Sequence, residues 1–576
     1  MKSSFIKILS LMASCFWLTI AGSCSPEKEA SPDPQPEEGA YYLALMLSTS
    51  QTMTRASEPS EQPEGRLPSL SEMEDKIDNL TLFLIDATGD NALTTTNNLE
   101  LSGKDLKFEK ALYVDFNNPN PDFIIDPQGT DIPSGYDNAI LIKLPPNTEL
   151  KDGQYAMAAV ANMGDQTAIK SLYELRKLIV DKIWENATAD QKPVARTNFA
   201  MSSYDENGGV LSRVYGFATY PGTRYSPFKG SCNLMRLAAR IDLGCSEIGA
   251  DGTIPQYGAI TADNEIAYNV TDGTETSGIV YVNAVELVNS MSKPSYALRH
   301  SKSATEISDP IDETNWFENL DCGGLLKKEG NNELAYIIDP NFLLKNKEEA
   351  DSKREDWFGD SRPEKIKADV VGSIDRFNEN RNALINQFIM SDADQADKNK
   401  GFTKTLTIGY VNENTFYNEK GIDPMKFATG LIFRAKFVPS KVYSAVDENN
   451  KPTSLNGKYS KGNSFWRVKA TVETKEAITY FDNEEAAKSF ATAQNGELIA
   501  YPGGIAYYNI WIRHAEEIKG KNDYVLQYGI VRNNVYRILL KIKGSGSPKP
   551  FEIPTETSWE VYTKPWNLRV QPEIIM

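Results

Sequence analysis

The sequence has very little histidine. Its 576 residues include only His300 and His514, and a histidine-rich metal site or a Ser-His-Asp triad would have to use one of them. His514 begins the tetrapeptide HAEE, which lacks the second histidine of the HExxH zinc motif. We therefore predict that the chain is not an enzyme and holds no metal or cofactor. A glycosidase that works with two carboxylates stays open.

Positive charge is also in deficit. Lys and Arg number 61 against 79 Asp and Glu, which gives a formal net charge of −18. This balance argues against nucleic acid or an anionic membrane surface as a partner, because both attract basic proteins. The acidic segment DADQAD (392–397) has two aspartates at calcium-loop spacing. It lacks the turn glycine and the closing glutamate, so we expect a solvated loop.

Cysteine is scarce as well, with five in the chain. Cys15 and Cys24 lie near the N-terminus, which leaves Cys232, Cys245 and Cys322. Three thiols cannot all pair within one chain, and their spacing indicates no metal site. Cys232 and Cys245 either form a disulfide or stay as buried free thiols, and both alternatives are open.

The apolar run near the N-terminus, ILSLMASCFWLTIAG, is too short and interrupted to span a membrane as a helix. With two preceding lysines it predicts a signal peptide over residues 1–23. Small residues directly precede Cys24, as in a bacterial lipoprotein signal, where the thiol is acylated with palmitate and becomes the new N-terminus. Cys15 is a rival lipid site, but apolar residues continue past it. A plain secreted protein with an incidental Cys24 is the other alternative.

A short strand pattern follows an acidic, proline-rich tether, in AYYLALMLSTSQTMTRA (40–56). Leu43, Leu45 and Leu47 alternate with Tyr42, Ala44 and Met46, so the three leucines share one face of an extended strand. Such a strand needs a sheet to complete. Arg55 follows within a few residues, in a Ser/Glu/Pro-rich stretch that is typical of a protease-sensitive loop.

The rest of the chain is typical of a strand-rich globular protein, with 40% apolar residues and 27 Tyr. Short strand patterns separated by Gly, Pro and Asn turns predict two β-sandwich domains, with a boundary near 225–232. One helix is predicted over Gln166–Trp184. The expected strands of the first half are 76–86, 110–116, 139–144, 153–163, 199–203 and 233–245, and those of the second half are 279–289, 403–411, 430–439, 506–514 and part of 524–548.

Three further patterns carry expectations. Both faces of the strand 76–86 are apolar, so it is expected at the centre of a sheet. The strand 233–245 is long, and its Arg236 and Arg240 are expected to face outward from the sheet. An insertion of helical character is expected at about 345–402, with a helix after the N-cap Ser373. Its apolar stripe consists of Ile374, Phe377, Leu384, Ile385 and Phe388.

The C-terminus ends in an alternating apolar pattern after the connector GSGSPKPFEIP. Pairing of this segment within its own domain is one reading, and donation to another chain is the other. The apolar residues of this pattern are Trp559, Val561, Trp566, Leu568, Val570 and Ile574.

The order of these features resembles the fimbrillins of Bacteroidetes, the subunits of type V pili, and most of all the Mfa-type shaft subunits of the minor fimbriae of Porphyromonas. The resemblance is carried by the lipoprotein signal and tether and by the segments KIDNLTLFLID, QYAMAAVANMGD, MRLAARIDL and IVRNNVYRILLKIKGSGSP. Each segment is a loose match alone, while their order is specific. Residues 290–402 match least.

The resemblance implies a mainly β fold of two transthyretin-like, Greek-key β-sandwich domains with a few helices in insertions. The implied parts are a signal peptide (1–23), a lipidated propeptide with the first strand (24–55), an N-terminal domain (56–228), a C-terminal domain (229–550) with the helical insertion, and a donor strand (551–576).

The resemblance also implies a function. The precursor would be an outer-membrane lipoprotein, and an arginine-specific surface protease would cut between Arg55 and Ala56, releasing the lipid and the first strand; Arg66 is the rival site. The C-terminal segment of another copy would fill the vacated groove and build a cell-surface fimbria. Implied partners are copies of the chain, fimbrial anchor and tip subunits, and host or bacterial receptors in adhesion, biofilm formation and virulence.

Two other functions remain as alternatives. The chain could be an anchor or tip subunit of the same fimbria, for which the helical insertion leaves room. It could also be a glycan-binding surface lipoprotein, whose platform would use exposed tryptophans. The candidates are Trp184, Trp316, Trp357, Trp466 and Trp511.

Overall fold

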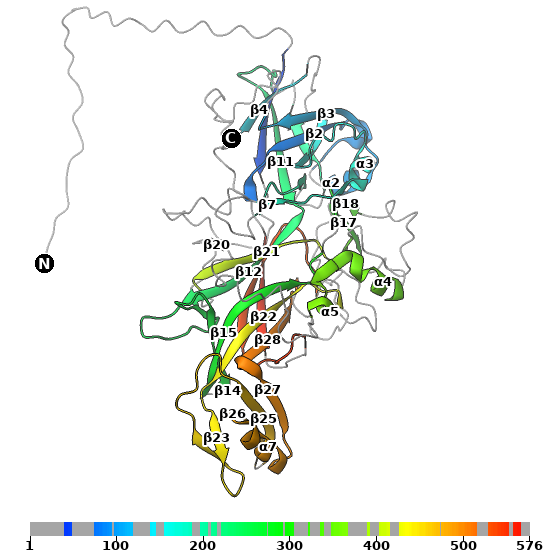
Figure 1. The fold of residues 1–576 in the computed structure, drawn as a ribbon. Coiled ribbons are helices and arrows are strands. Elements are labelled where there is room, and N and C mark those ends of the chain that lie inside the picture. The colour runs from blue at the N-terminus through cyan, green and yellow to red at the C-terminus, as the bar shows by residue number, and fades with distance from the viewer. Residues whose placement is uncertain are drawn as a thin grey trace, which may run out of the picture.

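The fold was analysed in a computed structural model of the chain. It describes residues 40–48, 74–94, 97–118, 139–145, 155–186, 196–204, 209–215, 220–272, 275–291, 294–303, 321–322, 335–338, 347–366, 389–391, 402–414, 426–472, 474–514, 528–551 and 557–565. The chain is mainly β, as the sequence predicts, and its two large sheets lie one above the other in Figure 1.

The first large sheet has eight strands in the order β3-β2-β5-β10-β11-β1-β4, with β9 beside β5 and β11. Most neighbours are antiparallel, while β1 runs parallel to β11. The strands are β1 (Tyr42–Ser48), β2 (Asn79–Asp86), β3 (Phe108–Asp115), β4 (Ala139–Lys143), β5 (Tyr155–Ala161), β9 (Met201–Ser203), β10 (Ser212–Tyr215) and β11 (Phe228–Arg236).

Apolar side chains cover both faces of this sheet. Leu80, Leu82 and Leu84 of β2 pack in one buried cluster, and Phe83 and Ile85 pack in the cluster on the opposite face. Side chains of a strand alternate between faces, so this pattern requires a strand covered on both sides. The prediction of a central strand at 76–86 is confirmed, since β2 lies between β3 and β5.

The predicted helix over Gln166–Trp184 is mostly wrong. The helix α3 spans only Leu172–Lys177, with the Ser171 side chain as N-cap acceptor. The chain then extends at once into β6 (Ile179–Val180), which pairs with β16 (Ser295–Tyr296) from the second half of the chain. β-Branched residues favour extended backbone, and this long-range pairing overrides the helical spacing.

The chain passes from the first sheet to the second at Leu237. The predicted strand 233–245 is two strands, β11 in the first sheet and β12 (Ala238–Glu247) in the second. The turn-rich segment 225–232, where a boundary is predicted, instead leads into β11. The predicted domain bounds stay a proposal, and the strand pairing favours a boundary at Leu237.

The second large sheet follows the order β20-β21-β12-β13-β14-β15-β22-β28, and β29 joins β12 to β30. It curves around one apolar core, to which β12, β14, β15, β21, β22, β28 and β29 contribute. Its other strands are β13 (Ala259–Ile260), β14 (Ile266–Asp272), β15 (Glu275–Val288), β20 (Ile389–Ser391), β21 (Lys404–Asn412), β22 (Gly430–Pro439), β28 (Ile505–Trp511), β29 (Asn534–Ile542) and β30 (Thr557–Pro565).

A smaller sheet is inserted between the neighbouring strands β22 and β28. Its order is β24-β23-β26-β25-β27, and helix α7 (Glu484–Ala493) packs on one face through Ala487 and Phe490. Figure 1 shows this unit at the end of the molecule away from the first sheet. Its strands are β23 (Tyr443–Val446), β24 (Pro452–Leu455), β25 (Phe465–Val472), β26 (Lys475–Phe481) and β27 (Glu497–Tyr501).

The predicted helical insertion is confirmed for residues 347–366, which include α4 (Lys347–Phe358) and α5 (Pro363–Ile366), whereas residues 389–391 of the same segment form the strand β20. Ser373 and the apolar stripe predicted to follow it lie outside the described residues. The remaining short elements are η1 (Gly89–Asn91), α2 (Asn98–Gly103), β7 (Glu185–Asn186), β8 (Arg196–Thr197), β17 (His300–Ser303), β18 (Asp321–Cys322), β19 (Ala335–Ile338), η4 (Gly359–Ser361) and η8 (Pro502–Gly504).

A buried ion pair holds the start of β29. The fully buried Arg532 guanidinium lies 2.8 Å from Glu413 Oε2 and donates to the Tyr296 carbonyl at 2.9 Å. Tyr296 belongs to β16, which pairs with β6 beside the first sheet. Arg532 therefore ties β29 to the region where the two sheets meet.

We predict that Glu413→Gln lowers the free energy of unfolding by about 3–5 kcal/mol, because it leaves the buried Arg532 charge without a counter-charge. Chemical denaturation of the purified chain measures this. The control Glu247→Gln breaks the exposed Lys404–Glu247 ion pair and should leave stability unchanged. Equal losses in both variants would contradict the special role of the buried pair.

Candidate assembly site

Strand β1 lies inside the first sheet rather than at its edge. Leu43 to Ser48 pair in parallel with Phe228 to Asn233 of β11, and Tyr42 to Met46 pair antiparallel with Lys143 to Ala139 of β4. The Tyr42 amide also donates to the Gly222 carbonyl at 2.8 Å. The backbone of β1 is thus hydrogen-bonded on both sides.

The side chains of β1 are core residues. Leu43 and Leu45 have no solvent-exposed surface, and Leu47 packs against the same cluster while partly buried. They lie beside Gly230 of β11, where an added Cβ would be at ordinary contact distance, 3.5 Å from Leu43 Cδ1. The prediction that the three leucines share one face is confirmed. Ala44 of the opposite face is also fully buried.

Strand β4 depends on β1. Among the described residues, β4 pairs with no strand other than β1. The next backbone contact, from the Leu144 amide to the Tyr41 carbonyl at 2.8 Å, again joins it to the chain just before β1. Removing β1 would therefore leave β4 without its sheet partner and would expose one edge of β11.

The C-terminal strand β30 pairs with β29 alone among the described strands, antiparallel, from Thr557 opposite Ile542 to Pro565 opposite Asn534. The backbone of this predicted donor segment is therefore an extended edge strand of its own chain. Trp559 and Val561 lie on β30, and the structure describes only their backbone. Trp566, Leu568, Val570 and Ile574 lie outside the described residues, as do Cys24, Arg55 and Ala56.

The sequence between β1 and β2 contains Arg55 and Arg66, and the described chain resumes at Glu74 in a buried charge cluster. Arg240 Nη1 donates to both carboxylate oxygens of Glu74, at 3.0 and 2.9 Å. Arg240 Nη2 lies 2.9 Å from Asp242 Oδ2, and the Tyr410 hydroxyl donates to Glu74 at 2.6 Å. Arg236 pairs with Asp75 and donates to the Glu74 carbonyl at 3.1 Å.

The prediction that Arg236 and Arg240 face outward is wrong. They are 0% and 4% exposed, because Glu74 and Asp75 approach from a segment about 160 residues earlier in the chain. Burial alone would lower the pKa of Arg240, but Asp242 and Glu74 more than offset it and raise that pKa. Burial raises the pKa of Asp75 to about 7, although Arg236 opposes the shift.

Both histidines contact groups of the chain itself. The fully buried His300 donates from Nε2 to the Arg176 carbonyl at 2.8 Å, and burial lowers its pKa to about 3. His514 contacts the Tyr536 hydroxyl at 2.7 Å, and burial lowers its pKa to about 4. Both rings are neutral structural groups at pH 7.

Cys232 and Cys245 are free and buried, which settles one of the alternatives that the sequence leaves open. Burial raises the pKa of both thiols to about 12, so neither is a reactive thiolate.

The described residues contain no cluster of three His, Cys, Asp or Glu side chains that could bind a metal ion. The described helices include none that is both long and apolar enough to cross a membrane.

Four of the five candidate tryptophans fall in the described residues, and all four pack against apolar clusters. Trp357 and Trp511 are buried, and Trp184 and Trp466 are partly buried. They therefore serve as core residues rather than as an exposed stacking platform. Trp316 lies outside the described residues.

Comparison with protein families gives a match over residues 499–572, to the model described as major fimbrial subunit protein type IV, fimbrillin, C-terminal. This match confirms the predicted resemblance to fimbrillins for the C-terminal part of the chain. The matched region includes β28, β29 and the C-terminal strand β30.

Two similar solved structures come from Porphyromonas gingivalis. The tip fimbrial protein Mfa3 is 13% identical with a TM-score of 0.30, covering 92% of this chain and 100% of that one. The fimbrillin FimA is 13% identical with a TM-score of 0.32, covering 92% and 98%. At these scores neither supports a transfer of individual residues. Comparison with curated protein sequences gives no match.

We predict that neutral His300 makes stability depend on pH. Its folded pKa of about 3 lies below the unfolded value of 6.5, so its contribution is complete above pH 6.5 and is lost as the pH falls toward 3. The stability advantage of the wild type over His300→Gln should fall by about 1.4 kcal/mol per pH unit below pH 6.

Urea unfolding of both proteins at several pH values measures that difference. The comparison isolates His300, because Asp75, with its raised pKa, contributes the opposite slope between about pH 4 and 7 in both proteins. A difference that is constant with pH would contradict a neutral buried histidine.

Proposed function

We propose that the chain is a shaft subunit of a cell-surface fimbria that polymerises by strand exchange. The precursor is a lipoprotein acylated at Cys24, and a protease cuts after Arg55, so that β1 leaves with the lipid. The C-terminal segment of another copy then takes the place of β1. The observation that carries the proposal is the position of β1, which pairs with both β11 and β4 and buries Leu43 and Leu45 completely, yet is followed in the sequence by Arg55.

Loss of β1 would leave an unstable groove between β11 and β4, which another strand would stabilise by filling it. The edges of β11 and β4 would present unpaired amides and carbonyls beside the apolar cluster that now holds Leu43 and Leu45. A strand from another chain can satisfy both edges, and each apolar side chain that it buries contributes about 1.5–3 kcal/mol. Several such residues would make the joint very slow to open, even after the ordering cost.

The C-terminal segment supports the donor role. It is already extended as β30, so it loses less backbone freedom on exchange than a disordered tail would. On donation, β30 would give up its backbone hydrogen bonds with β29 and form new ones with strands of the neighbouring subunit. Because the vacated groove and the donor strand lie on different parts of the chain, the contact is head-to-tail and does not close on itself, so it propagates a filament.

Anchor and tip subunits would differ from a shaft subunit in which strands they keep, accept or donate. An anchor would keep its lipid and its first strand, and a tip subunit would accept or donate at only one end. The combination of a cleavable sequence after β1 with an apolar C-terminal strand favours the shaft. The packed tryptophans speak against a glycan platform made of exposed indoles.

We predict that brief trypsin treatment of the lipid-free precursor cuts at Arg55 and yields SDS-resistant ladders and filaments. Mass spectrometry locates the cut and electron microscopy detects the polymer. The double variant Arg55→Ala, Arg66→Ala should stay monomeric. Ladders of equal intensity in that variant would show that removal of β1 is not the trigger.

We predict that a chain truncated after Pro554 and cut at Arg55 still accepts a donor strand but cannot extend the filament, because it lacks β30 and the residues beyond it. Mixing it with cleaved full-length subunits should shorten the filaments in proportion to its share. Filament growth that is unaffected by the truncated chain, or full polymerisation of the truncated chain alone, would reject the donor assignment.

A further inference from the structure

A pocket of about 400 Å³ lies beside the first sheet, away from the strands that the proposed exchange would involve. Its lining comes from the start of β2, the loop after β5, the segment from α3 to β7, and Asn198. None of the lining residues belongs to β1, β4, β11, β29 or β30, so a bound molecule would leave strand exchange free.

One wall of the pocket is polar and held in place. Asn198 Nδ2 donates to Asp78 Oδ2 at 2.5 Å and to Glu185 Oε2 at 2.9 Å. Lys182 Nζ lies 2.5 Å from Glu185, and Lys76 lies 2.9 Å from Asp78. Each of these two carboxylates therefore has its own lysine, and the Lys182 contact lowers the pKa of Glu185.

The base of this wall is preorganised. Asn162 has a left-handed backbone, with φ of 57°, and its Oδ1 accepts the Asp78 amide at 2.8 Å. Its Nδ2 donates to the Lys76 and Phe199 carbonyls at 2.8 and 2.9 Å. These bonds fix the start of β2, and hence Asp78, before any ligand arrives.

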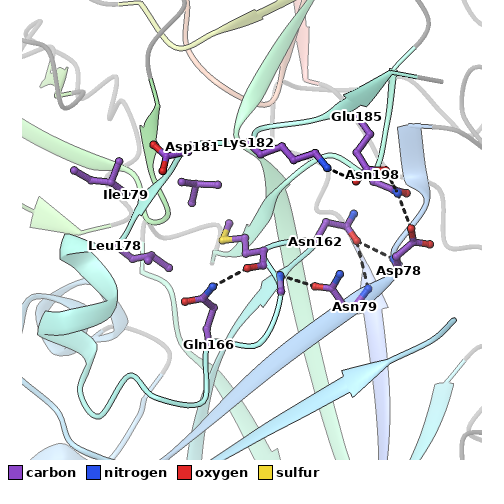
Figure 2. A pocket seen from close by; sticks show the side chains of 13 residues that line it. Asp78, Asn79, Asn162, Gln166, Leu178, Ile179, Asp181, Lys182, Glu185 and Asn198 are labelled. Atoms are coloured by element: carbon purple, nitrogen blue, oxygen red, sulfur yellow. Dashed lines mark hydrogen bonds and ion pairs between the residues drawn. The ribbon is translucent and has the colours of Figure 1, made fainter. Parts of the chain in front are cut away.

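The opposite wall is apolar with an acidic rim. Figure 2 shows Leu178, Ile179 and Asp181 across the cavity from Asp78, Glu185 and Asn198. Ile179 is 46% exposed, which is unusual for a large apolar side chain in this molecule. A ligand between the walls would therefore meet hydrogen-bonding groups on one side and hydrocarbon on the other.

We propose that this pocket binds a neutral sugar unit of a surface glycan. Vicinal hydroxyls can donate to the Asp78 and Glu185 carboxylates and accept from Lys182, while the C–H face of the ring packs on Ile179. A strongly charged ligand fits less well, because the Asp78 and Glu185 carboxylates are already paired with Lys76 and Lys182. This site would give an assembled subunit a receptor contact of its own.

Saturation-transfer NMR on the full chain tests the site with methyl β-D-galactopyranoside, methyl α-D-mannopyranoside and N-acetyl-D-glucosamine. Glucuronate and arginine methyl ester serve as anionic and cationic probes. At least one neutral sugar should bind, and Lys182→Met and Ile179→Ser should each weaken it at least tenfold. The Lys182 side chain is largely exposed and Ile179 is about half-exposed, so the variants should fold normally, which their thermal unfolding curves check.

Lys488→Met is the matched control, because it breaks a similar exposed Lys–Glu pair at 2.7 Å on α7, far from the pocket. It should bind the sugar as the wild type does. The proposal is overturned if no neutral sugar binds, if Lys182→Met binds as well as the control, or if arginine methyl ester binds more tightly than every sugar. Failure here would leave trypsin-triggered polymerisation unaffected, so the two proposals can fail separately.

Discussion

Arg240 joins Glu74 and Asp242 in a region that solvent barely reaches, and much of the molecule depends on this contact. Glu74 lies near the end of the stretch that separates β1 from β2, whereas Arg240 and Asp242 lie on β12, the first strand of the second sheet in chain order. Separating one carboxylate from Arg240 would leave a buried charge uncompensated, which is strongly destabilising. Any cut at Arg55 or Arg66 lies upstream of Glu74, so the contact survives the cut.

Two kinds of attachment thus flank the stretch that contains Arg55 and Arg66. β1 is held by backbone ladders and apolar burial, both of which another strand of suitable pattern can supply. Glu74 and Asp75 are held by specific charged partners, which no generic strand can replace. The contacts of β1 are therefore of a kind that another strand can replace, whereas those of Glu74 and Asp75 are not.

The sequence predicts elements best where alternation alone decides the structure. The predicted faces of the β1 and β2 leucines and the predicted bounds of β22 are correct, because each of these strands buries at least one strongly apolar face. Prediction fails where distant partners decide. The apolar spacing predicts a helix through Ile179, but pairing with β16 makes the chain extended from that residue on. Arg236 and Arg240 are buried because Glu74 and Asp75, about 160 residues earlier in the chain, pack against them. The sequence contains one local indication of this buried charge cluster: two arginines stand in an apolar strand with Asp242 close by.

The geometry of the groove also bears on how a replacement strand can enter. β1 runs parallel to β11 and antiparallel to β4, so those two strands run antiparallel to each other. A replacement of either direction must therefore make one parallel and one antiparallel ladder. Antiparallel pairing is slightly more stable per residue, but the two ladders are of similar length, so direction changes the total little. Register is decided instead by the apolar side chains that must refill the places of Leu43 and Leu45, because a slip by one residue turns every side chain to the other face.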